Sequence, residues 1–433
     1  MNSFVVKLGK LAYSRRGRHQ IASAVAALFA MLPGFIFPFV LPLAIGQSDA
    51  DTYLVAFGVS LTLWNVVVNN LELNTVSEVG RLFSESSDSI VDRGVLRVYF
   101  RKSLAFSGKV TVAFGTLLVV IYCLARSDFE SLFVAGILAL FIPLIGSVSS
   151  VYSGILISTG RSSVAVGTQG VRGIAGLLSI IPATYVGIWF ISVGFVFGEL
   201  LRASFLARFC QVSIGVSNKY VVLGTSGLAW QSSATATAQS SPLIDRLFLG
   251  FGGAGSIVAY EIADKILFSV VQFLNLSILI RVVGNWSRLG KLGFSEARAS
   301  VRRGLLYILG SSVALGALTT VVLIGVLKAG YIAEAWADGV LWGAILLMSL
   351  PLVMLNSTYG RLLILLGKQR LLIRFAIFSV FMNIVFDIVF FISLGPVGIV
   401  IATVAVRFVN AACYVLYFSR YGWIALENRS VSG

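Results

Sequence analysis

Charged residues are scarce in this chain of 433 residues: Asp, Glu, Lys and Arg make up 12% of it, while 58% is hydrophobic and the mean hydropathy is +0.93. A soluble domain carries about 25% charged residues, so the composition excludes a soluble globular protein. Apolar runs of about 20 residues recur from end to end, and each is long enough to cross a bilayer as a helix. The sequence therefore predicts an all-α, polytopic membrane protein.

Histidine and cysteine are almost as rare. The single histidine, His19, lies in a basic stretch near the N-terminus, which excludes a site built from several histidines. Cys123, Cys210 and Cys413 are scattered without metal-ligand spacing, and we interpret them as small apolar residues. The glycine-rich stretch "GFGGAGS" at 250–256 lacks the lysine of a nucleotide-binding loop. We expect no metal, no cofactor and no enzyme activity.

About twelve segments are expected to span the membrane. They lie near 21–46, 52–72, 104–125, 131–157, 163–186, 188–208, 221–241, 256–280, 304–327, 340–366, 373–394 and 397–418. The seventh is polar and rich in small residues ("LGTSGLAWQSSATATAQSSP"), so it should pack inside the helix bundle or line water.

The distribution of basic residues supports this count. With the N-terminus in the cytoplasm, the inside segments hold 24 Lys and Arg residues and the outside segments hold 3, which are Arg126, Arg246 and Lys328. Cytoplasmic loops carry such an excess in membrane proteins, and one missing span would abolish it. Both termini are therefore expected inside, and the net charge of +15 indicates membrane topology, not binding to nucleic acid.

An internal repeat divides the predicted spans into two halves. The fourth span ends "YSGILISTGR" at 152–161 and the tenth ends "YGRLLILLGK" at 359–368, an offset of 207 residues. Repeats of this kind occur in transporters, where the substrate path lies between the halves. We predict a six-helix bundle over 1–209, a cytoplasmic linker at 210–220, a second six-helix bundle over 221–433, and a central cavity.

Six basic residues lie inside the predicted spans: Lys109, Arg172, Arg202, Lys265, Arg361 and Arg407. A charge at the bilayer centre costs about 2.5–3.5 kcal/mol on the insertion scale, so such a residue faces protein or water. Arg172, Lys265 and Arg407 lie near mid-depth. The other three lie closer to the inside ends, where a long side chain can reach the interface.

Four acids accompany these cations: Glu199, Glu261, Asp264 and Asp387. Asp387 and Arg407 stand on opposite arms of a hairpin whose tight turn is "LGPVG" at 394–398, and Arg172 and Glu199 occupy the comparable hairpin of the first half. Two interpretations remain open. The charges form buried ion pairs that join helices, or the cations Arg172, Lys265, Arg407, Arg202 and Arg361 bind an anionic headgroup while the acids serve ion coupling.

Two stretches resemble a known group of transporters. The segment "MNIVFDIVFFISLGPVGIVIAT" at 382–403 is similar to the last helical hairpin of the multidrug/oligosaccharidyl-lipid/polysaccharide exporter superfamily; the matching residues are Asn383, Asp387, Gly395, Gly398, Ala402 and Thr403. The segment "IDRLFLGFGGAGSIVAYEIADKI" at 244–266 is similar to the lipid II flippases and the O-antigen repeat-unit flippases; the matching residues are Asp245, Arg246, Tyr260, Asp264 and Lys265.

The resemblance implies alternating access and a cargo of oligosaccharide linked to undecaprenyl diphosphate, flipped from the cytoplasmic to the periplasmic leaflet of a bacterial inner membrane. Membrane lipids and the polysaccharide polymerase machinery are the implied partners. Lipid II flippases usually carry an arginine in span one and two further spans, whereas residues 21–46 hold no charge and the sequence ends after span twelve. These departures favour an O-antigen or capsule flippase; the alternatives are a lipid II flippase and a cation-coupled multidrug exporter.

Overall fold

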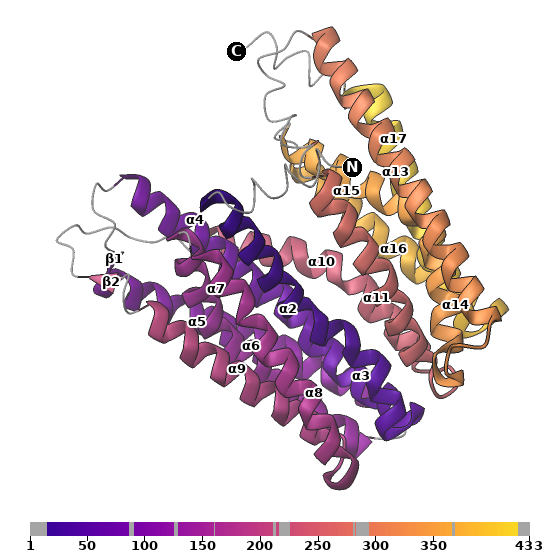
Figure 1. Ribbon diagram of the computed structural model, residues 1–433, viewed down its shortest axis with the longest axis horizontal. Helices are drawn as coiled ribbons and strands as arrows, with labels where there is room; N and C mark the ends of the chain where they lie inside the picture. Colours follow the sequence, from indigo (N-terminus) through magenta and orange to yellow (C-terminus); the bar gives the residue numbers. More distant parts are fainter. Residues whose placement is uncertain are drawn as a thin grey trace. The chain divides into compact units, whose positions relative to one another are not determined.

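The computed structural model of the chain describes residues 15–85, 91–124, 129–159, 161–210, 214–215, 226–279, 282, 294–365 and 369–422 (Figure 1). These residues are almost entirely helical, which confirms the all-α prediction. Two two-residue strands, β1 (Val91–Asp92) and β2 (Ile214–Gly215), form a small parallel pair. Most of the predicted linker at 210–220 lies outside the described residues.

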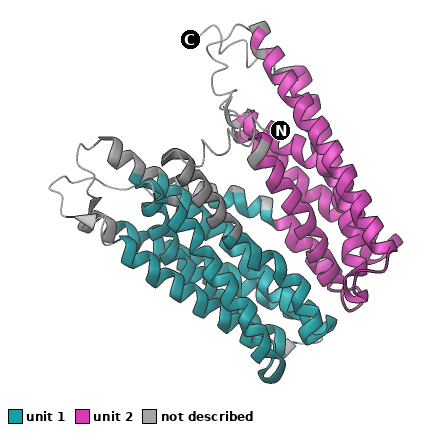
Figure 2. Cartoon of the chain, in the orientation of Figure 1, with its two compact units in different colours: residues 1–239 teal, residues 240–433 magenta. Residues whose placement is uncertain are grey.

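The chain divides into two compact units, Met1–Gln239 and Ser240–Gly433 (Figure 2). The first unit contains α2 (Arg15–Ile45), α3 (Gln47–Leu63), the π-helix η1 (Trp64–Asn69), α4 (Asn70–Glu85), α5 (Arg93–Leu124), α6 (Phe129–Ser158), α7 (Ser162–Gly167), α8 (Gln169–Val186), α9 (Trp189–Cys210) and the first part of α10 (Ser226–Leu249). The division therefore lies within α10, C-terminal to the expected linker. The boundaries 1–209 and 221–433 stay a prediction.

The second unit contains the rest of α10 and the remaining helices. These are α11 (Ser256–Leu274), the π-helix η3 (Asn275–Leu279), α13 (Phe294–Lys328), α14 (Glu334–Met348), α15 (Leu350–Leu365), α16 (Gln369–Leu394), α17 (Pro396–Tyr417) and the π-helix η5 (Phe418–Gly422). Helices α14 and α15 meet at Ser349 with a bend of 52° and together correspond to the predicted tenth span.

Each of the twelve predicted spans coincides with a helical segment of the structure. Eight helices within the described residues are long and apolar enough to cross a membrane, or nine if the bent pair α14 and α15 is one span. The observed helices often extend beyond the apolar run. For example, α5 begins at Arg93 and not near residue 104, because a helix continues through polar residues once its hydrogen-bond ladder is formed.

The two units repeat the same packing order. In the first unit, α6 packs against α3, α5 and α9, and α8 packs against α9. In the second unit, α14 packs against α11, α13 and α17, and α16 packs against α17. If the spans of each unit are numbered from one to six, the fourth span packs against the second, third and sixth in both units. The fifth span packs against the sixth in both units as well. This is the arrangement that an internal duplication predicts.

The predicted tight turn joins α16 to α17. Gly395 has a φ of +66°, in the left-handed region that favours glycine, and Pro396 follows at the first helical position of α17. A Cβ atom at Gly398 would lie 2.1 Å from the carbonyl oxygen of Phe390 on α16. The two helices therefore approach closely, and this hairpin fixes the height of Asp387 relative to residues on α17.

Candidate functional site

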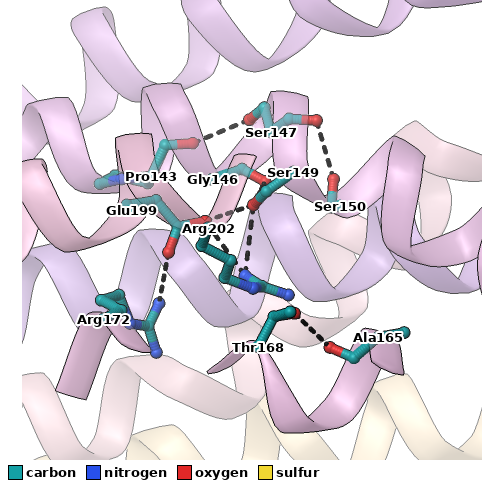
Figure 3. Close-up of polar contacts among 10 residues, drawn as sticks. All are labelled: Pro143, Gly146, Ser147, Ser149, Ser150, Ala165, Thr168, Arg172, Glu199 and Arg202. Atoms are coloured by element: carbon teal, nitrogen blue, oxygen red, sulfur yellow. Dashed lines mark hydrogen bonds and ion pairs between the residues drawn. The ribbon is translucent and has the colours of Figure 1, made fainter. Parts of the chain in front are cut away.

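A cluster of charged side chains lies inside the first unit, between α6, α8 and α9 (Figure 3). Glu199 Oε1 accepts from Arg202 Nη1 at 3.1 Å and from the hydroxyl of Ser149. Arg202 Nη1 also lies 3.2 Å from Ser149 Oγ. The other carboxylate oxygen of Glu199 lies 3.8 Å from Arg172 Nη1. Arg172 and Glu199, which lie on the two arms of the first-half hairpin, thus form an ion pair.

Burial separates the two arginines of this cluster. Arg202 is 1% exposed and Glu199 is fully buried, whereas the side chain of Arg172 is 20% exposed. The guanidinium of Arg172 lies 3.8 Å from the ring centroid of Trp64, at the start of η1, and that of Arg202 lies 5.7 Å from it. An aromatic face stabilises a cation at such distances. Arg202 was expected to reach the inside interface but instead joins the interior network.

A second cluster lies inside the second unit and is built around two aspartates. Asn383 Nδ2 donates to Asp245 Oδ1 at 2.7 Å and to Asp387 Oδ2 at 2.8 Å. Tyr260 donates to Asp245 Oδ2, and Thr403 Oγ1 lies 3.4 Å from the same oxygen. These five residues come from α10, α11, α16 and α17, and all are buried.

Among the described residues, no cation contacts the aspartate cluster; Arg407 lies within electrostatic range of Asp245 but not within 4.0 Å of it. Asp387 Oδ1 is buried and has no hydrogen-bond partner among the residues that the structure describes. Two carboxylates that share one amide cannot both keep a negative charge in an apolar interior without compensation. The arrangement is therefore suited to take up a proton or a monovalent cation. Within the described part of the chain, no group of three or more His, Cys, Asp and Glu side chains could hold a metal ion.

The pairing considered for Asp387 and Arg407 is wrong. Arg407 Nη1 donates to Ser349 Oγ at 2.8 Å, at the bend between α14 and α15. The backbone carbonyl of Arg407 accepts from Asn356 Nδ2 at 3.2 Å. Two residues at equal height on the arms of a hairpin need not form an ion pair. The side chains of Asp387 and Arg407 contact different neighbours. Arg407 is half-buried.

An ion pair that the sequence did not indicate joins α10 to α11. Arg246 Nη2 lies 2.5 Å from Glu261 Oε1, and its Nε donates to the same oxygen at 2.7 Å. Both residues are buried. The sequence predicts Arg246 in an outside loop, because the predicted seventh span ends at residue 241. Its position directly after Asp245, in a stretch with helical periodicity, was the signal that could have placed it in the helix.

The other predicted cations take part in fewer contacts. Lys265 and Arg361 are half-buried, and across the described residues neither side chain makes a hydrogen bond or an ion pair. Asp264 is also half-buried and lies within electrostatic range of both Lys265 and Arg407. Lys109 is exposed on α5, as expected for a side chain that reaches the interface.

The polar seventh span contacts protein, as predicted. Asn70 Nδ2 donates to Thr235 Oγ1 at 3.0 Å, and Asn65 Nδ2 donates to Gln239 Oε1 at 3.3 Å. Both asparagines lie at the π-helix η1 or directly after it. A π-helical turn widens the backbone and often marks a functional position. Here it turns two amides toward the first part of α10.

Comparison with solved structures identifies the fold. The chain resembles the lipid II flippase MurJ in an inward closed conformation, with a TM-score of 0.71 and 17% identity over 95% of this chain and 90% of that chain. It also resembles an inward-facing multidrug resistance MATE transporter of the MOP superfamily, with a TM-score of 0.65 and 15% identity over 91% of this chain and 99% of that one.

A third similar structure is a MOP superfamily transporter from Pyrococcus furiosus, with a TM-score of 0.63 and 13% identity over 94% of this chain and 96% of that one. No family model and no curated protein matches the sequence. The similarity covers nearly the whole length of each chain, so the protein has the transporter fold shared by these structures.

Proposed function

We propose that this protein is a transporter of the MOP superfamily that flips lipid-linked oligosaccharides from the cytoplasmic to the periplasmic leaflet by alternating access. Its cargo is a repeat unit of O-antigen or capsule carried on undecaprenyl diphosphate. The membrane is the bacterial inner membrane, with both termini in the cytoplasm, and the polysaccharide polymerase machinery is the partner that receives the cargo. The fold and the apolar helices support transport; the fold alone does not select the cargo.

The choice of cargo rests on one observation: the second unit contains half-buried cations with no carboxylate within 4.0 Å among the described residues. Among the described residues, Arg407 donates to a serine and no carboxylate lies within 4.0 Å of Arg407 or Lys265, while Asp264 is within electrostatic range of both. Such groups attract a compact anion, and an arginine can bind a diphosphate with two parallel hydrogen bonds. They would repel the lipophilic cations that a multidrug exporter carries.

The aspartate pair supplies a means of coupling. Asp245 and Asp387 are held together by Asn383, and they need one positive charge to remain in the interior. We propose that a proton or a monovalent cation binds there and that its movement drives the conformational cycle. Glu261 does not serve this purpose, because Arg246 already neutralises it. Asp264 remains a second candidate, since it is half-buried and within electrostatic range of Lys265 and Arg407.

The MurJ-like fold supports a lipid II flippase as the second candidate. Both cargoes carry a prenyl diphosphate, and the half-buried cations suit either one. The two candidates differ in the sugar, so the test uses two sets of cells: a panel that lacks repeat-unit flippases of different sugar specificity, and cells depleted of their lipid II flippase.

The test compares the wild-type protein with Arg407→Ala, Arg172→Ala and Lys265→Ala at matched membrane levels. The proposal predicts that wild type restores surface polysaccharide in one strain of the panel and that Arg407→Ala and Lys265→Ala insert but fail. Rescue of the depleted cells alone would favour the lipid II cargo. Absence of rescue in every strain would contradict both candidates, and full activity of all three variants would show that these cations do not bind cargo.

A further inference from the structure

Both units contain the same contact between an arginine and a serine. In the first unit, Arg202 on α9 donates to Ser149 on α6, the fourth span, at 3.2 Å. In the second unit, Arg407 on α17 donates to Ser349, at the bend of the tenth span, at 2.8 Å. The two arginines lie 205 residues apart, close to the offset of 207 between the similar stretches at 152–161 and 359–368. The two serines lie 200 residues apart, so the two contacts join corresponding spans, the sixth to the fourth and the twelfth to the tenth, without occupying identical repeat positions.

The two copies of this contact differ in charge. In the first unit, Glu199 lies three residues before Arg202, accepts from it at 3.1 Å and accepts from Ser149 as well. In the second unit, the residue three positions before Arg407 is Val404. Within the described part of the chain, one guanidinium is therefore neutralised by a carboxylate, and the other is held by a neutral hydroxyl without a carboxylate within 4.0 Å.

The two copies also differ in accessibility. Arg202 is 1% exposed, so no ligand can reach it without opening the packing of α6 against α9. Arg407 is half-buried and uses one of its nitrogens for Ser349. Because a guanidinium has five N–H groups in a fixed fork, this contact orients Arg407 and leaves a bidentate edge for an anion.

The acids near Arg407 do not neutralise it by contact. Asp245 and Asp264 are within its electrostatic range, but neither lies within 4.0 Å of its nitrogens in the described structure. Asp245 is already bonded to Asn383 and Tyr260. The charge of Arg407 therefore remains available to a ligand.

From this asymmetry we infer that the second unit binds the diphosphate of the lipid through Arg407, that Ser349 is the positioning residue for its guanidinium, and that Arg202 is a structural cross-link in the first unit. This inference rests on the proposed function, because it assigns the anionic headgroup of the same cargo to one side chain. Ser349 can act in this way because it lies at the 52° bend between α14 and α15, where the helix axis changes direction next to α17.

The probe for this inference is farnesyl diphosphate, with farnesyl monophosphate and farnesol as reference compounds. Full-length purified protein in detergent is titrated with each compound, and binding is followed by the rise in the apparent melting temperature. Wild type should bind the diphosphate more tightly than the alcohol. Arg407→Gln should weaken diphosphate binding about 10- to 100-fold, as expected for the loss of hydrogen bonds to a charged group, and should leave farnesol binding unchanged.

Two substitutions of Ser349 separate positioning from packing. Threonine and valine have the same shape: Ser349→Thr and Ser349→Val both add a methyl group at Cβ, and valine carries a second methyl group where threonine keeps the hydroxyl. We expect Ser349→Thr to retain the preference for diphosphate over monophosphate and Ser349→Val to lose it. Ser149→Ala is the matched control from the other copy of the contact. It should lower the melting temperature without probe and leave the response to farnesyl diphosphate unchanged.

The outcomes distinguish this inference from the proposed function. If wild type does not prefer the diphosphate over farnesol, the proposed cargo is wrong. If wild type prefers it and both Arg407→Gln and Ser349→Val bind it as wild type does, the cargo stands and the assignment to Arg407 is wrong. Equal losses in Ser349→Thr and Ser349→Val would also overturn the role of the Ser349 hydroxyl.

Discussion

Replacing Glu199 by glutamine should destabilise the first unit strongly. Glu199 is fully buried and is the carboxylate within 4.0 Å of both Arg172 and Arg202. Glutamine keeps the shape of the side chain but removes its charge, so the buried guanidinium of Arg202 loses the carboxylate that contacts it, and Glu72 on α4 remains only within its electrostatic range. Breaking a buried ion pair in this way costs about 3–5 kcal/mol.

The size of the effect follows from the size of the unit. In proteins of 150–250 residues, 1 kcal/mol shifts the melting temperature by about 2–4 °C. A loss of about 3 kcal/mol in the first unit should therefore lower its apparent melting temperature by roughly 6–12 °C.

The assay uses the cysteines of the chain. Cys123 and Cys210 are buried in the first unit, and Cys413 lies in the second. In a Cys413→Ala background, a thiol-reactive dye reports the unfolding of the first unit alone. Glu130→Gln, at an exposed position in the first turn of α6, is the matched control and should melt with wild type.

A double substitution tests whether the loss of stability in Glu199→Gln comes from the unpaired charge of Arg202. Replacing Glu199 and Arg202 together by leucine removes both buried charges, so this variant should melt closer to wild type than Glu199→Gln does. If Glu199→Gln melts within about 1 °C of wild type, less than the shift for 1 kcal/mol, the cluster does not stabilise the first unit and our account of Arg202 as a structural cross-link is wrong.

Three further predictions concern the second unit. Gly398→Ala should prevent normal folding and membrane accumulation, because its Cβ would lie 2.1 Å from the carbonyl oxygen of Phe390; normal yield and fluorescence-detected gel filtration would contradict this. Arg246→Gln should cost about 3–5 kcal/mol by leaving Glu261 unpaired, and adding Glu261→Gln should restore most of the lost melting temperature. Asp387→Asn should abolish the dependence of transport on an ion gradient while leaving farnesyl diphosphate binding intact; gradient-dependent transport in this variant would refute the coupling proposal.

The sequence was sufficient for the positions of the helices. Hydropathy and the placement of Lys and Arg gave twelve segments, and every one coincides with a helix, because a span in lipid must satisfy its backbone hydrogen bonds internally. The turn at Gly395 was also predictable, since glycine followed by proline suits a left-handed residue before a new helix. The hairpin argument placed Arg172 near Glu199, but the same argument was wrong for Asp387 and Arg407, so it does not by itself predict a pair.

The partners of most site residues were not predictable from the sequence. Asp245 meets Asn383 across 138 residues, and no local pattern brings α10 and α16 together. Arg202 was misjudged because its depth along the helix was considered and its rotation about the helix axis was not; it faces Glu199 and not the interface. Arg246 was misjudged because hydropathy declines before the helix ends.

The most direct test of the central claim is a flipping assay in proteoliposomes. Purified protein is reconstituted with a prenyl diphosphate that carries N-acetylglucosamine, and a galactosyltransferase added outside labels only the sugar in the outer leaflet. Our account predicts that wild type moves the lipid-linked sugar from the inner to the outer leaflet, so that nearly all of it becomes labelled. Arg407→Gln should do so far more slowly, and a prenyl-linked sugar without phosphate should not be moved. Labelling that stops at the outer half with wild type, under every imposed ion gradient, would contradict the claim that this protein flips a lipid-linked saccharide.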